Sequence, residues 1–62
     1  MKFADRVRAL VPSNIDVAWD SSRLRLSQGT KHVEMVVTRA MSSNLHALPL
    51  FLQPAIWHLT HE

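Results

Sequence analysis

The chain has 62 residues, a formal net charge of +2, no cysteine and a hydrophobic fraction of 47%. This length corresponds to one small domain, residues 1–62, and such a domain buries only about 60% of the surface of its unfolded chain. The hydrophobic fraction excludes a disordered chain, and no apolar run reaches the about 18 residues of a membrane-spanning helix. Without cysteine there are no disulfides or thiolate metal sites, and we expect a protein of the reducing cytoplasm.

Residues 2–10 are predicted to form a short amphipathic helix. Its apolar positions follow a helical spacing and share one side: Phe3, Val7, Leu10 and Val11. The charged residues fill the other side, and this pattern is not that of a signal peptide. Pro12 disfavours helical geometry at Val11 and ends the helix. Because so short a helix is unstable alone, its apolar stripe must dock on another element.

Three strands are predicted next, the first at residues 15–19 and the others in the hairpin of residues 23–38. Apolar and polar residues alternate along each run, which is typical of strands with one covered face. The segment Asp20-Ser21-Ser22 is a tight polar connection. Gly29, the only glycine, lies between the two runs of the hairpin, where a turn favours a residue that tolerates positive φ.

The alternation also restricts the hairpin register. Leu24 and Leu26 must share a face with Val33 and Met35, which requires a loop of even length, either residues 28–29 or residues 27–30. The opposed pairs in this register are Leu24–Val33, Leu26–Lys31, Arg23–Glu34 and Arg25–His32. A sheet with one apolar face needs a cover. The fold class is therefore α+β: a three-stranded antiparallel meander packed by an N-terminal helix and a proline-interrupted C-terminal helical segment, in the order α-β-β-β-α.

The C-terminal segment is rich in leucine and alanine but contains two prolines. A proline inside a helix removes one hydrogen bond and clashes one turn back, costing about 3 kcal/mol. We expect a short helix from about Ser43, with Ser42, Ser43 or Asn44 as N-cap, and a second helix starting near Pro54. Whether Pro49 and Pro54 kink one helix or separate two stays open.

This segment carries more apolar residues than one helical stripe can bury. One side can cover the sheet, and the remainder either packs when the segment folds back or meets another protein. The predicted interface comprises Leu48, Phe51, Leu52, Ile56 and Trp57. We therefore expect a small non-catalytic interaction module that binds itself or another protein, as regulators, inhibitors and adaptors do, some of them from phages or other mobile elements. A membrane-surface helix is disfavoured because the segment has no Lys or Arg.

A nucleic-acid-binding regulator is the alternative, with a basic patch on the first helix and the hairpin: Arg6, Arg8, Arg23, Arg25 and Lys31. No exposed tyrosine or phenylalanine is interleaved with these residues for base stacking. Double-stranded-RNA-binding domains share the α-β-β-β-α order, but their second helix starts with lysines and Ser42-Ser43-Asn44-Leu45 stands at that place here. The order alone assigns no family.

Neither a metal site nor catalysis is predicted. His58 and His61 are spaced i, i+3 on a helix, but a zinc site would need a third ligand from His32 or His46. The serines fall in turns and caps, where serine makes local hydrogen bonds. We therefore expect no enzyme activity and no cofactor.

Overall fold

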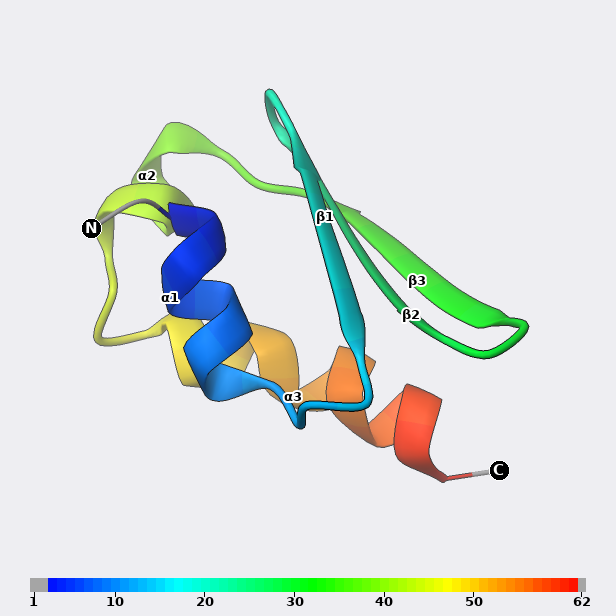
Figure 1. Cartoon of the computed structure of the whole chain (residues 1–62). Helices are drawn as coiled ribbons and strands as arrows, with labels where there is room; N and C mark the ends of the chain where they lie inside the picture. Colours follow the sequence, from blue (N-terminus) through cyan, green and yellow to red (C-terminus); the bar gives the residue numbers. More distant parts are fainter. Residues whose placement is uncertain (1–2, 62) are drawn as a thin grey trace.

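The computed structural model describes residues 3–61. Its elements follow the predicted order, and the helical end is divided in two (Figure 1). The elements are α1 (Phe3–Leu10), β1 (Asp16–Asp20), β2 (Arg23–Gln28), β3 (Lys31–Val36), α2 (Arg39–Ser43) and α3 (Leu48–Thr60). This confirms the α+β fold with a three-stranded antiparallel sheet. Residue 2, the predicted start of the first helix, lies outside the described residues.

The sheet has the order β1-β2-β3, so each strand pairs with its neighbour in the chain. The even length of the loop in the second hairpin is confirmed, but the loop residues differ from both predicted ranges. Gln28 pairs with Lys31, which leaves Gly29 and Thr30 as the loop. Gly29 has φ +63°, as the first position of a tight hairpin turn requires.

The predicted register of this hairpin was wrong by two residues. Leu26 is opposite Val33, and Leu24 is opposite Met35. Arg25 is opposite Glu34, whereas His32 is opposite Ser27. A shift of two residues keeps every side chain on its face, so the alternation of apolar residues could not distinguish the two registers. The Arg23–Glu34 ion pair is nevertheless present, as a diagonal contact with 3.7 Å between Arg23 Nη1 and Glu34 Oε2.

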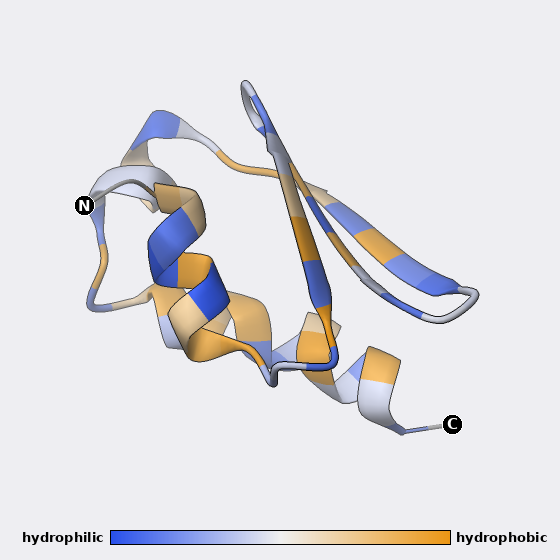
Figure 2. Ribbon diagram, viewed as in Figure 1, coloured by the Kyte–Doolittle hydropathy of each residue, from blue (hydrophilic) through white to orange (hydrophobic). Residues whose placement is uncertain are grey.

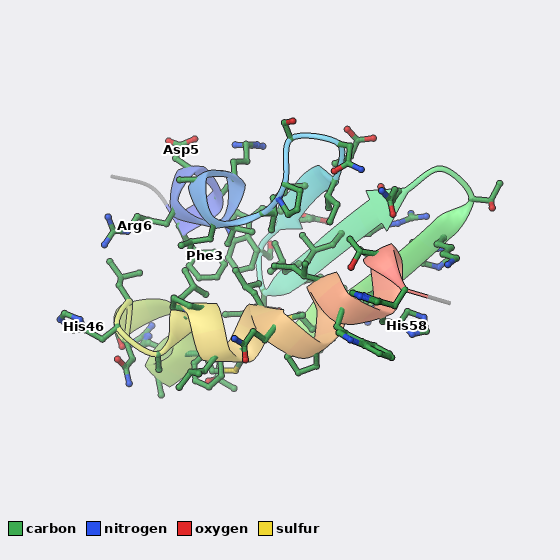
Figure 3. All side chains as sticks on the ribbon, turned by 90° about the horizontal axis from the view of Figure 1, so that it is seen from below. Phe3, Asp5, Arg6, His46 and His58 are labelled. Carbon is green, nitrogen blue, oxygen red and sulfur yellow. The ribbon has the colours of Figure 1, made fainter. Side chains whose placement is uncertain are left out.

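Both α1 and α3 cover the apolar face of the sheet. Helix α1 packs on β1, with the rings of Phe3 and Trp19 at 4.7 Å between centroids. Helix α3 packs on β2 and β3, and Figure 3 shows the two helices flanking the apolar side chains of the sheet. Among residues 3–61, nine buried residues form the core: Val7, Ile15, Leu24, Leu26, Val37, Leu48, Leu52, Ala55 and Leu59. Leu10, predicted on the buried stripe of the first helix, is 42% exposed instead.

The start of the C-terminal helical region differs from the prediction. Helix α2 begins after Thr38, whose Oγ1 accepts a hydrogen bond from the backbone N–H of Met41 at 3.2 Å. Ser42 and Ser43 lie inside α2 and donate to the carbonyl of Arg39, so they are not N-caps. Asn44 is the C-cap of α2, and its Oδ1 accepts from the backbone N–H of Ala47.

Helix α3 begins at Leu48 and continues through Pro54, so the predicted helix start near Pro54 was wrong. Proline does occupy a first helical turn here, but it is Pro49. Pro54 has no N–H for the carbonyl of Leu50, one turn back. Since Leu50 and Pro54 are both exposed, water can hydrogen-bond this carbonyl, which lowers the cost of the proline to the helix.

Candidate interaction surface on the C-terminal helix

Helix α3 is apolar on two opposite sides. The inner side consists of four residues that are at most 5% exposed: Leu48, Leu52, Ala55 and Leu59. Leu50, Pro54 and Trp57 are spaced i, i+4 and i+7 and lie on the opposite side, and all three are exposed. Leu50 is 67% and Trp57 60% exposed. Phe51 flanks this stripe at 36% exposure. We call Leu50, Phe51, Pro54 and Trp57 the outer surface of α3.

The predicted interface residues are divided between the two sides of α3. Phe51 and Trp57 are exposed, and Ile56 is half-buried. Leu48 and Leu52 belong to the core, so they offer no contact area to a partner. The sequence reasoning missed Leu50 and Pro54, which could have been found as the positions one turn and two turns before Trp57.

No formal charge interrupts this region of the molecule. The chain contains no Asp, Glu, Lys or Arg between Ala40 and His61. Figure 2 shows the contrast: α1 alternates strongly hydrophilic and hydrophobic bands, whereas α3 is mostly hydrophobic or intermediate. An apolar side of a helix is normally buried, and in the described chain only one of the two apolar sides of α3 is covered.

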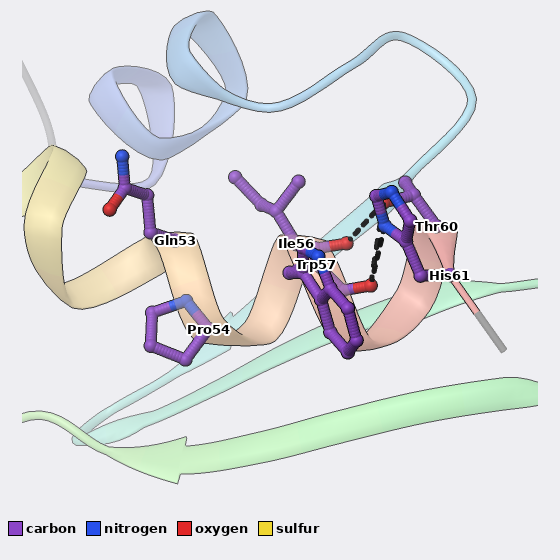
Figure 4. A pocket seen from close by; sticks show the side chains of 6 residues that line it. All are labelled: Gln53, Pro54, Ile56, Trp57, Thr60 and His61. Atoms are coloured by element: carbon purple, nitrogen blue, oxygen red, sulfur yellow. Dashed lines mark hydrogen bonds between the residues drawn. The ribbon is translucent and has the colours of Figure 1, made fainter.

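Trp57 is held in place at the C-terminal end of α3 (Figure 4). The ring of His61 stacks on its indole, with 4.8 Å between centroids and 8° between the planes. The Nδ1 of His61 lies 3.2 Å from the carbonyl oxygen of Trp57 and 3.0 Å from Thr60 Oγ1. Thr60 in turn donates to the carbonyl of Ile56 at 2.8 Å. These contacts reduce the rotamer freedom that Trp57 would lose on binding a partner.

Two open hollows adjoin the outer surface of α3. One, of about 490 Å³, lies beside Trp57 and is lined by Gln53, Pro54, Ile56, Trp57, Thr60 and His61 (Figure 4). The other, of about 350 Å³, lies between α3 and β3. Its lining is formed by Val33, Met35, Phe51, Pro54, Ala55 and His58. Pro54 borders both hollows. The two hollows and the outer surface of α3 therefore form one continuous, mainly apolar surface.

The five basic residues of the alternative site do not form one patch. Arg23 and Arg25 lie on the uncovered face of the sheet, where Asp20 is opposite Arg23 and Glu34 is opposite Arg25. Lys31 is opposite Gln28 at the end of the hairpin and points to the covered face.

Arg6 and Arg8 lie on α1, on the other side of the molecule from Arg23 and Arg25. Arg8 Nη1 contacts Asp5 Oδ1 at 3.2 Å. Carboxylates thus accompany three of the five cations, which weakens the electrostatic attraction of any one surface for phosphates.

The histidines are dispersed. His46 lines a hollow next to Arg6 at one end of α3, whereas His58 lies near the other end (Figure 3). Among residues 3–61, no group of three or more His, Asp or Glu side chains converges on a point that a metal could occupy. Within the same residues, no helix is long and apolar enough to cross a membrane.

Comparison of the chain with protein-family models, curated proteins and solved structures finds no match.

Proposed function

We propose that the chain is a non-catalytic protein-interaction module that associates with itself through the outer surface of α3. The observation that carries this proposal is the helix with two apolar sides. In the described chain one side packs on the sheet, and the other exposes Leu50, Phe51 and Trp57 to solvent. Contiguous exposed apolar surface of this kind is typical of interaction sites.

A second copy of the chain is favoured over other partners by charge. The outer surface has no charged residue, so two copies can meet without repulsion between like charges. A nucleic acid or an anionic membrane would instead select for Lys and Arg, and α3 offers none. A domain of this size also gains stability from association, because its own core is small.

Trp57 and Phe51 are the expected anchors of the interface. Both are aromatic, and large aromatic side chains dominate the binding energy of protein interfaces. Trp57 is also pre-oriented by His61, with which it stacks. Pro54 lies between these anchors along the helix, and Leu50 extends the apolar surface beyond Phe51.

The proposal is tested by the solution mass of the wild type and of two variants, Phe51→Asp and Trp57→Asp. We expect the wild type to form dimers at micromolar concentrations and each variant to dissociate, with the dimer Kd raised roughly 30-fold or more for the loss of an interface anchor. Sedimentation velocity over a concentration series measures this change. Ala40→Asp, at an exposed position in the first turn of α2, adds the same charge elsewhere and should leave the dimer unchanged.

A wild type that is folded and monomeric at every concentration would contradict the proposal. Circular dichroism of each variant separates loss of association from loss of the fold. If Trp57→Asp unfolds a monomeric protein, Trp57 serves the core and not an interface.

A further inference from the structure

The sheet has two free edges, and they differ in how well each can pair with the same edge of a second copy of the chain. Within residues 3–61, the order β1-β2-β3 leaves one side of β1 and one side of β3 without a neighbouring strand. No backbone hydrogen bond from the rest of the described chain reaches the outer side of either strand. Free edges of this kind are templates for pairing with another chain.

Charge disfavours self-pairing at β1. When the same strand from two copies of the chain pairs in antiparallel orientation about a two-fold axis, residues opposite one another must belong to the same face of the sheet. Full overlap of two β1 strands is centred on Ala18 and places Asp16 of each copy opposite Asp20 of the other. Like charges directly opposite one another are destabilising.

At β3 the same rule gives a favourable arrangement. Two registers overlap five residues of Lys31–Val36 and preserve the faces, one centred on Val33 and one on Glu34. The register centred on Glu34 opposes two carboxylates. The register centred on Val33 places His32 of each copy opposite Glu34 of the other, so an imidazole N–H can donate to a carboxylate twice per dimer.

We propose that two copies of the chain pair their β3 strands antiparallel about Val33 and form a continuous six-stranded sheet. This inference rests on the proposed self-association and specifies its geometry. The partner is a second copy of this chain.

The pairing also brings the two α3 helices together. Strands in a sheet lie about 4.8 Å apart, and α3 packs on both β2 and β3. The axes of two α3 helices on either side of the two-fold axis are then about 10 Å apart, which is the distance of packed helices. Phe51, Pro54 and His58 face the second copy, and the hollow between α3 and β3 is closed.

The contact area favours this arrangement over contact between the helices alone. A stable dimer buries about 800 Å² per copy, which is more than one side of a 13-residue helix supplies. The edge of β3 and the hollow beside it add to the area. Phe51 and Pro54 lie near the centre of the combined interface.

A scan with single cysteines tests the register, because the chain has no cysteine of its own. In the proposed dimer the two copies of residue 33 are directly opposite, with about 4.5–5.5 Å between Cα atoms, within the range of a disulfide. Val33→Cys should therefore form disulfide-linked dimers under mild oxidation. His32→Cys and Glu34→Cys should not, because each copy of these residues is displaced from its counterpart along the strand.

The outcomes separate the inference from the proposed function. Dimers that crosslink through residue 33 support both. A dimeric protein that crosslinks through residue 34 overturns the register centred on Val33. A dimeric protein that crosslinks through none of the three positions overturns the β3 pairing itself. Both results leave self-association through α3 intact. A folded protein that is monomeric at every concentration overturns both.

Charge changes at His32 provide a second measurement. His32→Lys retains an attractive partner opposite Glu34 of the second copy, whereas His32→Glu opposes two carboxylates at two places in the dimer. We expect the Kd of His32→Glu to exceed that of His32→Lys by roughly 5- to 30-fold, from two cross-strand pairs per dimer. Ala18→Glu and Ala18→Lys, a matched pair on β1, should have equal Kd values. Equal Kd values for the two His32 variants would overturn the inference.

Discussion

The two main helices cover the same face of one sheet, yet they differ in what they present to solvent. Helix α1 buries Val7 and exposes Asp5, Arg6 and Arg8. Helix α3 buries four residues and exposes Leu50, Pro54 and Trp57 on its opposite side. Water hydrates the charged side chains on the outer side of α1, whereas the outer side of α3 exposes apolar side chains to it. Helix α1 has one apolar side and one charged side, as is typical of a helix at a protein surface. Helix α3 has two apolar sides, a composition typical of a helix that packs between two layers.

The largest expected effect is on the inner side of α3. Leu52 is fully buried, and Leu52→Ala should lower the free energy of unfolding by about 3 kcal/mol through lost burial and a cavity. A domain of this size has only about 3–9 kcal/mol in total, so the variant should be close to unfolding. Leu50→Ala on the outer side is the matched control and should cost under about 0.5 kcal/mol in the monomer. Urea denaturation of dilute protein measures both; equal losses would remove the distinction between the two sides.

Replacement of Pro54 should raise the free energy of unfolding, by less than Leu52→Ala lowers it. Pro54→Ala restores the N–H that can bond to the carbonyl of Leu50 and removes the clash of the ring. The unfolded chain gains freedom in return, so we expect a net stabilisation of about 1–2 kcal/mol. A raised Tm and greater α3 helicity by circular dichroism would show this. A lowered Tm would mean that packing of the Pro54 ring outweighs the restored hydrogen bond.

The smallest expected effect is on the exposed side of α1. Arg8 Nη1 and Asp5 Oδ1 are 3.2 Å apart, and both side chains are more than half exposed. Such pairs contribute about 0.3–0.5 kcal/mol, so Arg8→Ala should change the free energy of unfolding by no more than that. A double-mutant cycle with Asp5→Ala isolates the pair. A coupling energy well above 1 kcal/mol would show that α1 depends on its charges more than its solvent exposure suggests.

Local patterns predicted the sheet because each strand alternates and a single glycine separates two of them. The register of the second hairpin was harder to predict from the sequence. Gly29 can occupy either position of a two-residue loop, and the two choices differ by two residues in register while keeping Leu24 and Leu26 on the same face. The choice between them depends on turn geometry and on packing across the sheet, which alternation does not record.

The C-terminal region was predicted less well because its local signals compete. Serine is common both at N-caps and in short helices where its hydroxyl bonds back to a carbonyl, so Ser42 and Ser43 did not mark a helix start. Proline inside a helix removes one hydrogen bond and clashes one turn back, and the cost is lower where the freed carbonyl can reach water. That condition depends on which side of α3 faces solvent, and hence on tertiary packing. The same packing decided that Leu48 and Leu52 are core residues while Phe51 and Trp57 are exposed.

The strand order has a consequence for how quickly the chain folds. Each strand of the sheet pairs with the strand next to it in the chain, across loops of two residues. Hairpins of this kind form in about 1–10 μs, and folds dominated by such local pairings reach the native state quickly. The slower step is then the docking of α3. This step brings the end of the chain into contact with β2, which lies in the middle of the sequence. A chain paused before that step would expose both apolar sides of α3 at once.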